Sequence, residues 1–61
     1  MLYYVEIYAD GESEELLDTI PARSLVDARQ IAKGHKDADG RTAEIYRKTE
    51  NGYDEHVESV L

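Results

Sequence analysis

Hydrophobic residues recur along the chain with two different periods, which predict four strands and one helix. The stretches 2–9 and 15–22 are rich in strand-forming residues, and a polar connection that begins at Asp10 separates them. Alternate residues of a strand lie on opposite faces. The first stretch therefore has one face made of Tyr3, Val5, Ile7 and Ala9 and another made of Leu2, Tyr4, Glu6 and Tyr8. In the second stretch, Pro21 lacks an amide hydrogen, so we expect this strand at the edge of a sheet, with Leu16, Ile20 and Ala22 on one face.

A helical period begins after the second strand. Ser24 is a favoured N-cap residue, and Asp27 places a carboxylate in the first turn. An apolar stripe with a period of about 3.6 residues follows; it consists of Leu25, Ala28, Ile31 and Ala32. Gly34 comes directly after this stripe, where a left-handed C-cap residue is expected. The pattern predicts a helix from Leu25 to Lys33.

The last third of the chain predicts a hairpin, with strands at 41–49 and 53–60 around Gly52. A two-residue loop would pair Ile45 with Glu58 and would mix apolar and charged residues on both faces. A three-residue loop with Gly52 in the left-handed conformation pairs Ile45 with Val57, Tyr46 with His56, Arg47 with Glu55 and Lys48 with Asp54. Consistency of the two faces favours the three-residue loop, at the cost of placing Glu44 opposite Glu58.

These elements predict an α+β domain in the order ββαββ. Its four-stranded antiparallel sheet has the strand order 2-1-3-4, with the helix packed on one face. The predicted core is small and consists of Val5, Ile7, Ile20, Leu25, Ala28, Ile31, Ala32, Ala43, Ile45 and Val57.

The length limits how stable such a fold can be. The 61 residues form a single domain, 1–61, and a domain of about 60 residues buries only ~60% of the surface of its unfolded chain. Domains of this size commonly gain stability from disulfides, a metal or association. The chain has no cysteine and two histidines, so we expect no disulfide, no metal and no cofactor, and association is the device that is left.

Charge is distributed unevenly. Residues 1–22 carry six acids and no base, residues 23–48 carry all seven basic residues with four acids, and residues 49–61 carry four acids and no base. A net charge of −7 disfavours direct binding to nucleic acid or to anionic lipid. The chain has no apolar run of membrane-spanning length and its first residues do not resemble a signal peptide, so we expect a cytoplasmic protein that does not bind membranes.

The face of the sheet away from the helix is the leading candidate site. We expect it to carry a protein interface made of Tyr4, Tyr8, Tyr46, Leu17, His56 and Val60. Tyrosine is enriched at interfaces because it combines a large apolar ring with a polar tip. An uncovered apolar face on a small domain indicates a homodimer or another protein partner. The competing interpretation is that these tyrosines are only good strand formers on a solvated face.

An acidic patch supports a second hypothesis. Five carboxylates at and after the first turn could imitate the phosphates of a nucleic acid and occupy a host nucleic-acid-binding protein; they are Asp10, Glu12, Glu14, Glu15 and Asp18. Solubility alone also explains such a patch.

Catalytic and metal chemistry have weak candidates. His35 and His56 fall on different elements, and no cysteine or serine is placed in the pattern to pair with either. The segment 37–40 resembles the start of a calcium loop, but Lys48 occupies the position of its bidentate glutamate, so we expect an ordinary loop there. The basic residues around the helix (Arg23, Arg29, Lys33 and Lys36) could contact the phosphates of a nucleic acid, but charge balance with the two acidic hairpins explains them more simply. We therefore expect no enzymatic activity.

The segment Ile20–Ala32, together with the hairpin Ala43–Val60, resembles a pattern seen in many small proteins of bacteria and their phages. The resemblance is one of architecture and points to no named family. It implies an accessory or host-takeover protein rather than a metabolic one. The sequence thus predicts a small, acidic, non-catalytic interaction module.

Overall fold

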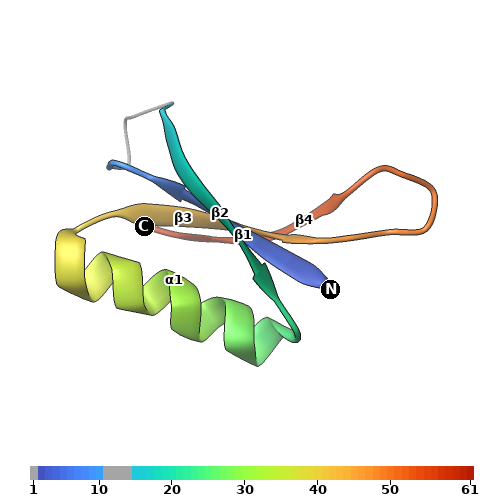
Figure 1. The fold of residues 1–61 in the computed structure, drawn as a ribbon, viewed down its shortest axis with the longest axis horizontal. Helices are drawn as coiled ribbons and strands as arrows, with labels where there is room; N and C mark the ends of the chain where they lie inside the picture. The colour runs from blue at the N-terminus through green and yellow to red at the C-terminus, as the bar shows by residue number, and fades with distance from the viewer. Residues whose placement is uncertain (1, 11–14) are drawn as a thin grey trace.

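A computed structural model describes residues 2–10 and 15–61 and shows the predicted α+β architecture (Figure 1). The four strands form one antiparallel sheet in the order β2-β1-β3-β4, and a single helix packs on one face. The elements are β1 (Tyr3–Tyr8), β2 (Leu16–Ala22), α1 (Leu25–Asp39), β3 (Thr42–Arg47) and β4 (Glu55–Val60). β2 lies at an edge, as Pro21 predicted.

The core lies between α1 and the two central strands. Val5 and Ile7 of β1 and Ile45 of β3 are 0% exposed, and they are the largest fully buried side chains. Small residues complete this layer and let the helix approach the sheet closely; they are Ala22, Ala28, Ala32 and Ala43. The other predicted core residues pack around this centre and are partly buried: Ile20, Leu25, Ile31 and Val57.

The helix is longer than predicted. Ser24 caps it by accepting a hydrogen bond from the Asp27 amide, but α1 continues through Gly34 and ends at Asp39. Gly40 is the C-cap, with φ of 69°, and its amide donates to the Lys36 carbonyl at 2.9 Å. The prediction that Gly34 ends the helix is therefore wrong. His35 lies four residues after Ile31 and is half-buried, so it extends the stripe that faces the sheet.

The predicted loop at 37–40 is also corrected by this longer helix. Asp37 and Asp39 belong to the last turn of α1. In the described part of the chain, no group of three or more potential metal-ligating side chains is close enough to hold an ion. The same residues contain no helix long and apolar enough to cross a membrane.

A bulge in β4 changes the predicted register of the last hairpin. Tyr46 pairs with His56 and Arg47 with Glu55, as the three-residue loop predicts. Beyond Tyr46 the register shifts, and the new pairs are Ile45 with Glu58, Glu44 with Ser59 and Ala43 with Val60. The predicted pairing of Ile45 with Val57 is therefore wrong.

The bulge has an electrostatic explanation. An unbulged strand would place Glu44 directly opposite Glu58, and like charges in that position are destabilising. The shift moves Glu58 to the helix side of the sheet, where its Oε1 accepts hydrogen bonds from Arg29 of α1, the shorter at 2.8 Å. It also moves Val60 onto the helix side, where it packs against the core.

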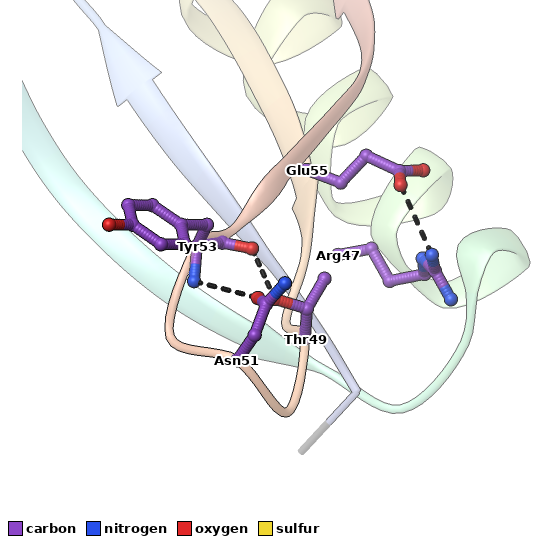
Figure 2. Close-up of polar contacts among 5 residues, drawn as sticks. All are labelled: Arg47, Thr49, Asn51, Tyr53 and Glu55. Atoms are coloured by element: carbon purple, nitrogen blue, oxygen red, sulfur yellow. Dashed lines mark hydrogen bonds and ion pairs between the residues drawn. The ribbon is translucent and has the colours of Figure 1, made fainter.

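The connection between β3 and β4 projects beyond the helix at one end of the molecule (Figure 1). Pairing ends at Arg47 and Glu55, whose side chains form an ion pair of 3.1 Å, so residues 48–54 make a wider loop than predicted. Gly52 has φ of 83°, as the left-handed position required. Inside the loop, the side-chain oxygen Oδ1 of Asn51 accepts hydrogen bonds from the Tyr53 amide, at 3.1 Å, and from Thr49 Oγ1 (Figure 2).

A second bulge lies in β2. Ile7 pairs with Asp18, whereas Tyr8 pairs with Leu16, so Leu17 is the extra residue. Leu16 therefore lies across from Tyr8, and its predicted place on the face of Ile20 and Ala22 is wrong. Asp18 pairs with a core residue of β1 and lies on the helix side of this edge strand.

Candidate functional site

The face of the sheet away from α1, here called the open face, carries three rows of side chains. The register places them as Pro21, Tyr4, Tyr46 and His56 in the first row, Thr19, Glu6, Glu44 and Ser59 in the second, and Leu16, Tyr8 and Thr42 in the third. Within residues 2–10 and 15–61, the only helix lies on the opposite side of the sheet (Figure 1). No described helix or strand covers this face.

The first row is aromatic. The rings of Tyr4 and Tyr46 stack with centroids 5.2 Å apart and planes 15° from parallel. The imidazole of His56 meets Tyr46 edge-on, with centroids 5.3 Å apart. On the other side, Lys48 Nζ lies 5.8 Å from the centre of the Tyr4 ring, and the Tyr4 hydroxyl donates to Asp54 at 2.7 Å. The row is therefore held at both ends; its two tyrosines are half-buried and His56 is exposed.

The surroundings of the tyrosines favour their neutral form. Burial, followed by the hydrogen bond to Asp54, raises the pKa of Tyr4 to about 12. The hydrogen bond to Glu6 and burial raise the pKa of Tyr8, and burial and the charges of Glu6 and Glu44 raise that of Tyr46. All three are uncharged hydrogen-bonding groups at neutral pH.

The second row places two carboxylates at the centre of the sheet. Glu6 of β1 and Glu44 of β3 are direct cross-strand partners, and the β-carbons of such a pair are about 5 Å apart. Glu6 accepts from the Tyr8 hydroxyl at 3.0 Å. Glu44 Oε2 accepts from Ser59 Oγ at 2.5 Å and contacts His56 Nε2 at 2.7 Å. Among the described residues, no lysine or arginine forms an ion pair with either carboxylate.

The cluster of Ser59, His56 and Glu44 resembles a hydrolase triad in composition, and the sequence pattern had not placed a serine near a histidine. The bulge in β4 brings Ser59 Oγ to 3.4 Å from His56 Nε2. A triad needs the imidazole between the serine and the acid, with one nitrogen on each. Here the serine hydroxyl and the same Nε2 both meet Glu44 Oε2. The arrangement therefore lacks the geometry of a triad.

The predicted interface residues are only partly brought together. Tyr4, Tyr8, Tyr46 and His56 share the open face. Leu17 lies at the β2 bulge on the edge of the sheet and is 41% exposed. Val60 packs on the helix side, so its predicted place on this face is wrong.

The predicted acidic patch does not form one described surface. Glu12 and Glu14 lie outside the described residues. Asp18 is on the helix side of β2, and its carboxylate accepts from the Thr19 amide at 2.8 Å. Asp10 lies two residues after the end of β1, and Glu15 directly precedes β2.

Shallow pockets lie on both sides of the sheet. On the open face, a pocket of about 240 Å³ is lined by Tyr4, Thr19, Pro21, Lys48 and Asp54. On the helix side, His35 lines a wider hollow with Ile20 and Ile31, and its buried Nδ1 has no described hydrogen-bond partner. The open-face pocket adjoins the aromatic row and enlarges the candidate interface.

Comparison of the chain with protein-family models, with curated proteins and with solved structures gave no match.

Proposed function

We propose that the protein is a non-catalytic interaction module that binds another polypeptide through its open face. The observation that carries the proposal is the aromatic row of Tyr4, Tyr46 and His56 on a sheet face that no described helix or strand covers. Uncovered aromatic surfaces of this kind are typical of protein interfaces. A cytoplasmic location and an accessory role, as in small phage proteins, are part of the proposal and rest on the sequence alone.

The organisation of the row supports binding rather than simple strand formation. Tyr4, Lys48 and Asp54 hold one another through the 2.7 Å hydrogen bond and the cation above the ring. Side chains fixed before binding lose less conformational entropy when a partner arrives. The ring surfaces are consequently presented in a fixed orientation.

The test compares a double variant of the row with a matched control. Tyr4→Ser with Tyr46→Ser removes both stacked rings, whereas Tyr53→Ser removes a tyrosine that is 82% exposed in the β3–β4 loop. We expect the first variant to lose a partner that the wild type and the control retain in an affinity capture. Circular dichroism and thermal melting establish that each variant is folded. Equal retention by folded Tyr4→Ser/Tyr46→Ser would contradict the proposal.

The alternative, an acidic inhibitor that competes with nucleic acid, rests on net charge. It predicts binding that weakens steeply with salt and depends on the acids at 10–18 instead of the tyrosines. The same capture, repeated with the acids at 10–18 replaced by their amides, distinguishes the two.

A further inference from the structure

The open face has a chemical feature beyond its aromatic row, which is the facing pair Glu6 and Glu44. They occupy the middle of the two central strands, so they mark the centre of the face. Like charges in direct cross-strand positions destabilise a sheet. Thr19 and Ser59, their outer neighbours in the same row, are uncharged. Within the described residues no lysine or arginine pairs with either carboxylate, and the His56 imidazole, 2.7 Å from Glu44, is the one histidine contact to the pair.

A second copy of the chain is a poor occupant for this face. Two identical faces that pack together do so around a twofold axis through the middle of the interface. Such an axis would bring Glu6 and Glu44 of both copies together, with Asp54 adding to the acidic surface. Lys48 is engaged over Tyr4 at one end of the face, and His56 already contacts Glu44. Charge complementarity thus selects a basic partner over self-association.

The size of the open face favours a short peptide segment of a partner protein over a broad folded surface. Strands spaced about 4.8 Å apart and rising about 3.3 Å per residue give a face of roughly 20 by 20 Å, or about 400 Å². A standard protein interface buries about 800 Å² on each partner. In flat projection the open face measures about half of that number, and such a small face suits a short peptide segment lying across the rows.

Arginine fits the centre better than lysine. A guanidinium is planar, donates from several N–H groups in a fixed fork, and stacks on aromatic rings. The two carboxylates offer acceptors on neighbouring strands, and the Tyr46 ring lies in the adjoining row on the same strand as Glu44. We propose that the open face binds an arginine-bearing basic segment of a partner protein, with one guanidinium bridging Glu6 and Glu44 beside the tyrosine row. This inference rests on the proposed function and specifies the partner's chemistry.

The experiment uses blocked hexaarginine as the probe and hexalysine as a peptide of equal charge. Titrations of the isotope-labelled protein, followed by amide NMR, locate binding and give its affinity. We expect shifts at residues of the open face in β1 and β3, and tighter binding of hexaarginine than of hexalysine. Glu6→Gln with Glu44→Gln keeps the size and one acceptor oxygen of each side chain and removes both charges, and we expect it to weaken hexaarginine binding about tenfold.

The control variant removes the same charge elsewhere. Asp37→Asn with Glu50→Gln lies on the helix and the β3–β4 loop, and both residues are exposed. We expect this variant to bind hexaarginine within about twofold of the wild type. Equal weakening by both variants, shifts centred on residues 10–18, absence of binding, or a dimer that covers the open face would each overturn the inference.

A gain-of-charge variant provides a test that does not depend on removing a side chain from the row. Thr19 is exposed and is the cross-strand neighbour of Glu6, so Thr19→Arg would place a guanidinium of the protein itself beside the pair. We expect it to raise the melting temperature and to weaken hexaarginine binding several-fold. Unchanged binding in folded Thr19→Arg would contradict the inference.

The two proposals fail in different ways. Loss of a captured partner in Tyr4→Ser/Tyr46→Ser but not in Glu6→Gln/Glu44→Gln would leave the open face as the binding surface and would refute the arginine-bearing partner. Retention of the partner in both folded variants would refute the open face itself.

Discussion

Replacing glycine by alanine should have opposite effects on the stability of the protein at two positions in the helix region. Gly34 lies inside α1, and Gly40 is the left-handed residue that ends it. A β-carbon added at either position meets no atom within 4 Å. Backbone conformation alone therefore decides the outcome of replacing each glycine by alanine.

The magnitudes follow from helix propensity and from the left-handed conformation. Inside a helix, alanine is about 0.8–1.0 kcal/mol more favourable than glycine, so Gly34→Ala should stabilise the protein by about that amount. At Gly40, φ is 69°, and an L-residue in this region costs roughly 1–2 kcal/mol. At roughly 0.05–0.15 kcal/mol per residue, the whole domain is stable by only about 3–9 kcal/mol. Both changes are a measurable share of the total.

Thermal melting and urea denaturation of the two single variants provide the assay. For a domain of this size, 1 kcal/mol corresponds to about 4–8 °C in Tm. We expect Tm to rise in Gly34→Ala and to fall in Gly40→Ala, with unchanged urea m-values. The opposite signs would mean that the helix ends at Gly34 and would refute the description of α1.

Three further predictions address the core, the loop and the tyrosine row. Ile45 is 0% exposed, so Ile45→Val should cost about 0.5–1.5 kcal/mol by urea denaturation, and no loss would contradict its place in the core. Asn51 accepts from the Tyr53 amide in the β3–β4 loop, so Asn51→Ala should cost about 0.5–1.5 kcal/mol, a result that an unchanged Tm would refute. The pKa of Tyr4 is raised from 10.0 to about 12, so the neutral phenol is favoured by folding. The stability that it contributes is full below pH 10 and is lost as the pH rises from about 10 to 12; tyrosinate absorbance should show a step near pH 12 that Tyr4→Phe removes.

The sequence predicted the edge position of β2 and the start of the helix because single residues decide them, and the strand order followed from the handedness of the crossover. Pro21 assigns β2 to an edge, and Ser24 supplies the cap of α1. The helix extends beyond the predicted end because its apolar stripe does not stop at Ala32. His35 continues it at helical spacing, and its polar ring concealed the continuation.

The sequence predicts the register of the last hairpin near its loop, at Tyr46 and Arg47, but not beyond the bulge. The pattern shows that a regular register would place the like charges of Glu44 and Glu58 opposite each other. The bulge avoids this repulsion by pairing Glu44 with Ser59. The pattern does not predict the position of the bulge, because that position depends on the ion pair between Glu58 and Arg29 of the helix. The alternation of residues along the strands predicts that the tyrosines share one face. The contact of Ser59 with Glu44 and the position of Val60 on the helix side both result from the register shift at the β4 bulge.

The two bulges also govern how the sheet can grow. An exposed edge strand offers unpaired amide and carbonyl groups to which a further strand can add. In this protein, β2 is interrupted at Leu17 and contains Pro21, and β4 is interrupted at Val57 and carries Glu55. Neither edge provides a long regular row of main-chain groups, because bulges disrupt the ladder. Addition of a fifth strand from another chain is therefore disfavoured on both sides, which protects a domain with so small a core from fibril-like stacking and leaves recognition to side chains.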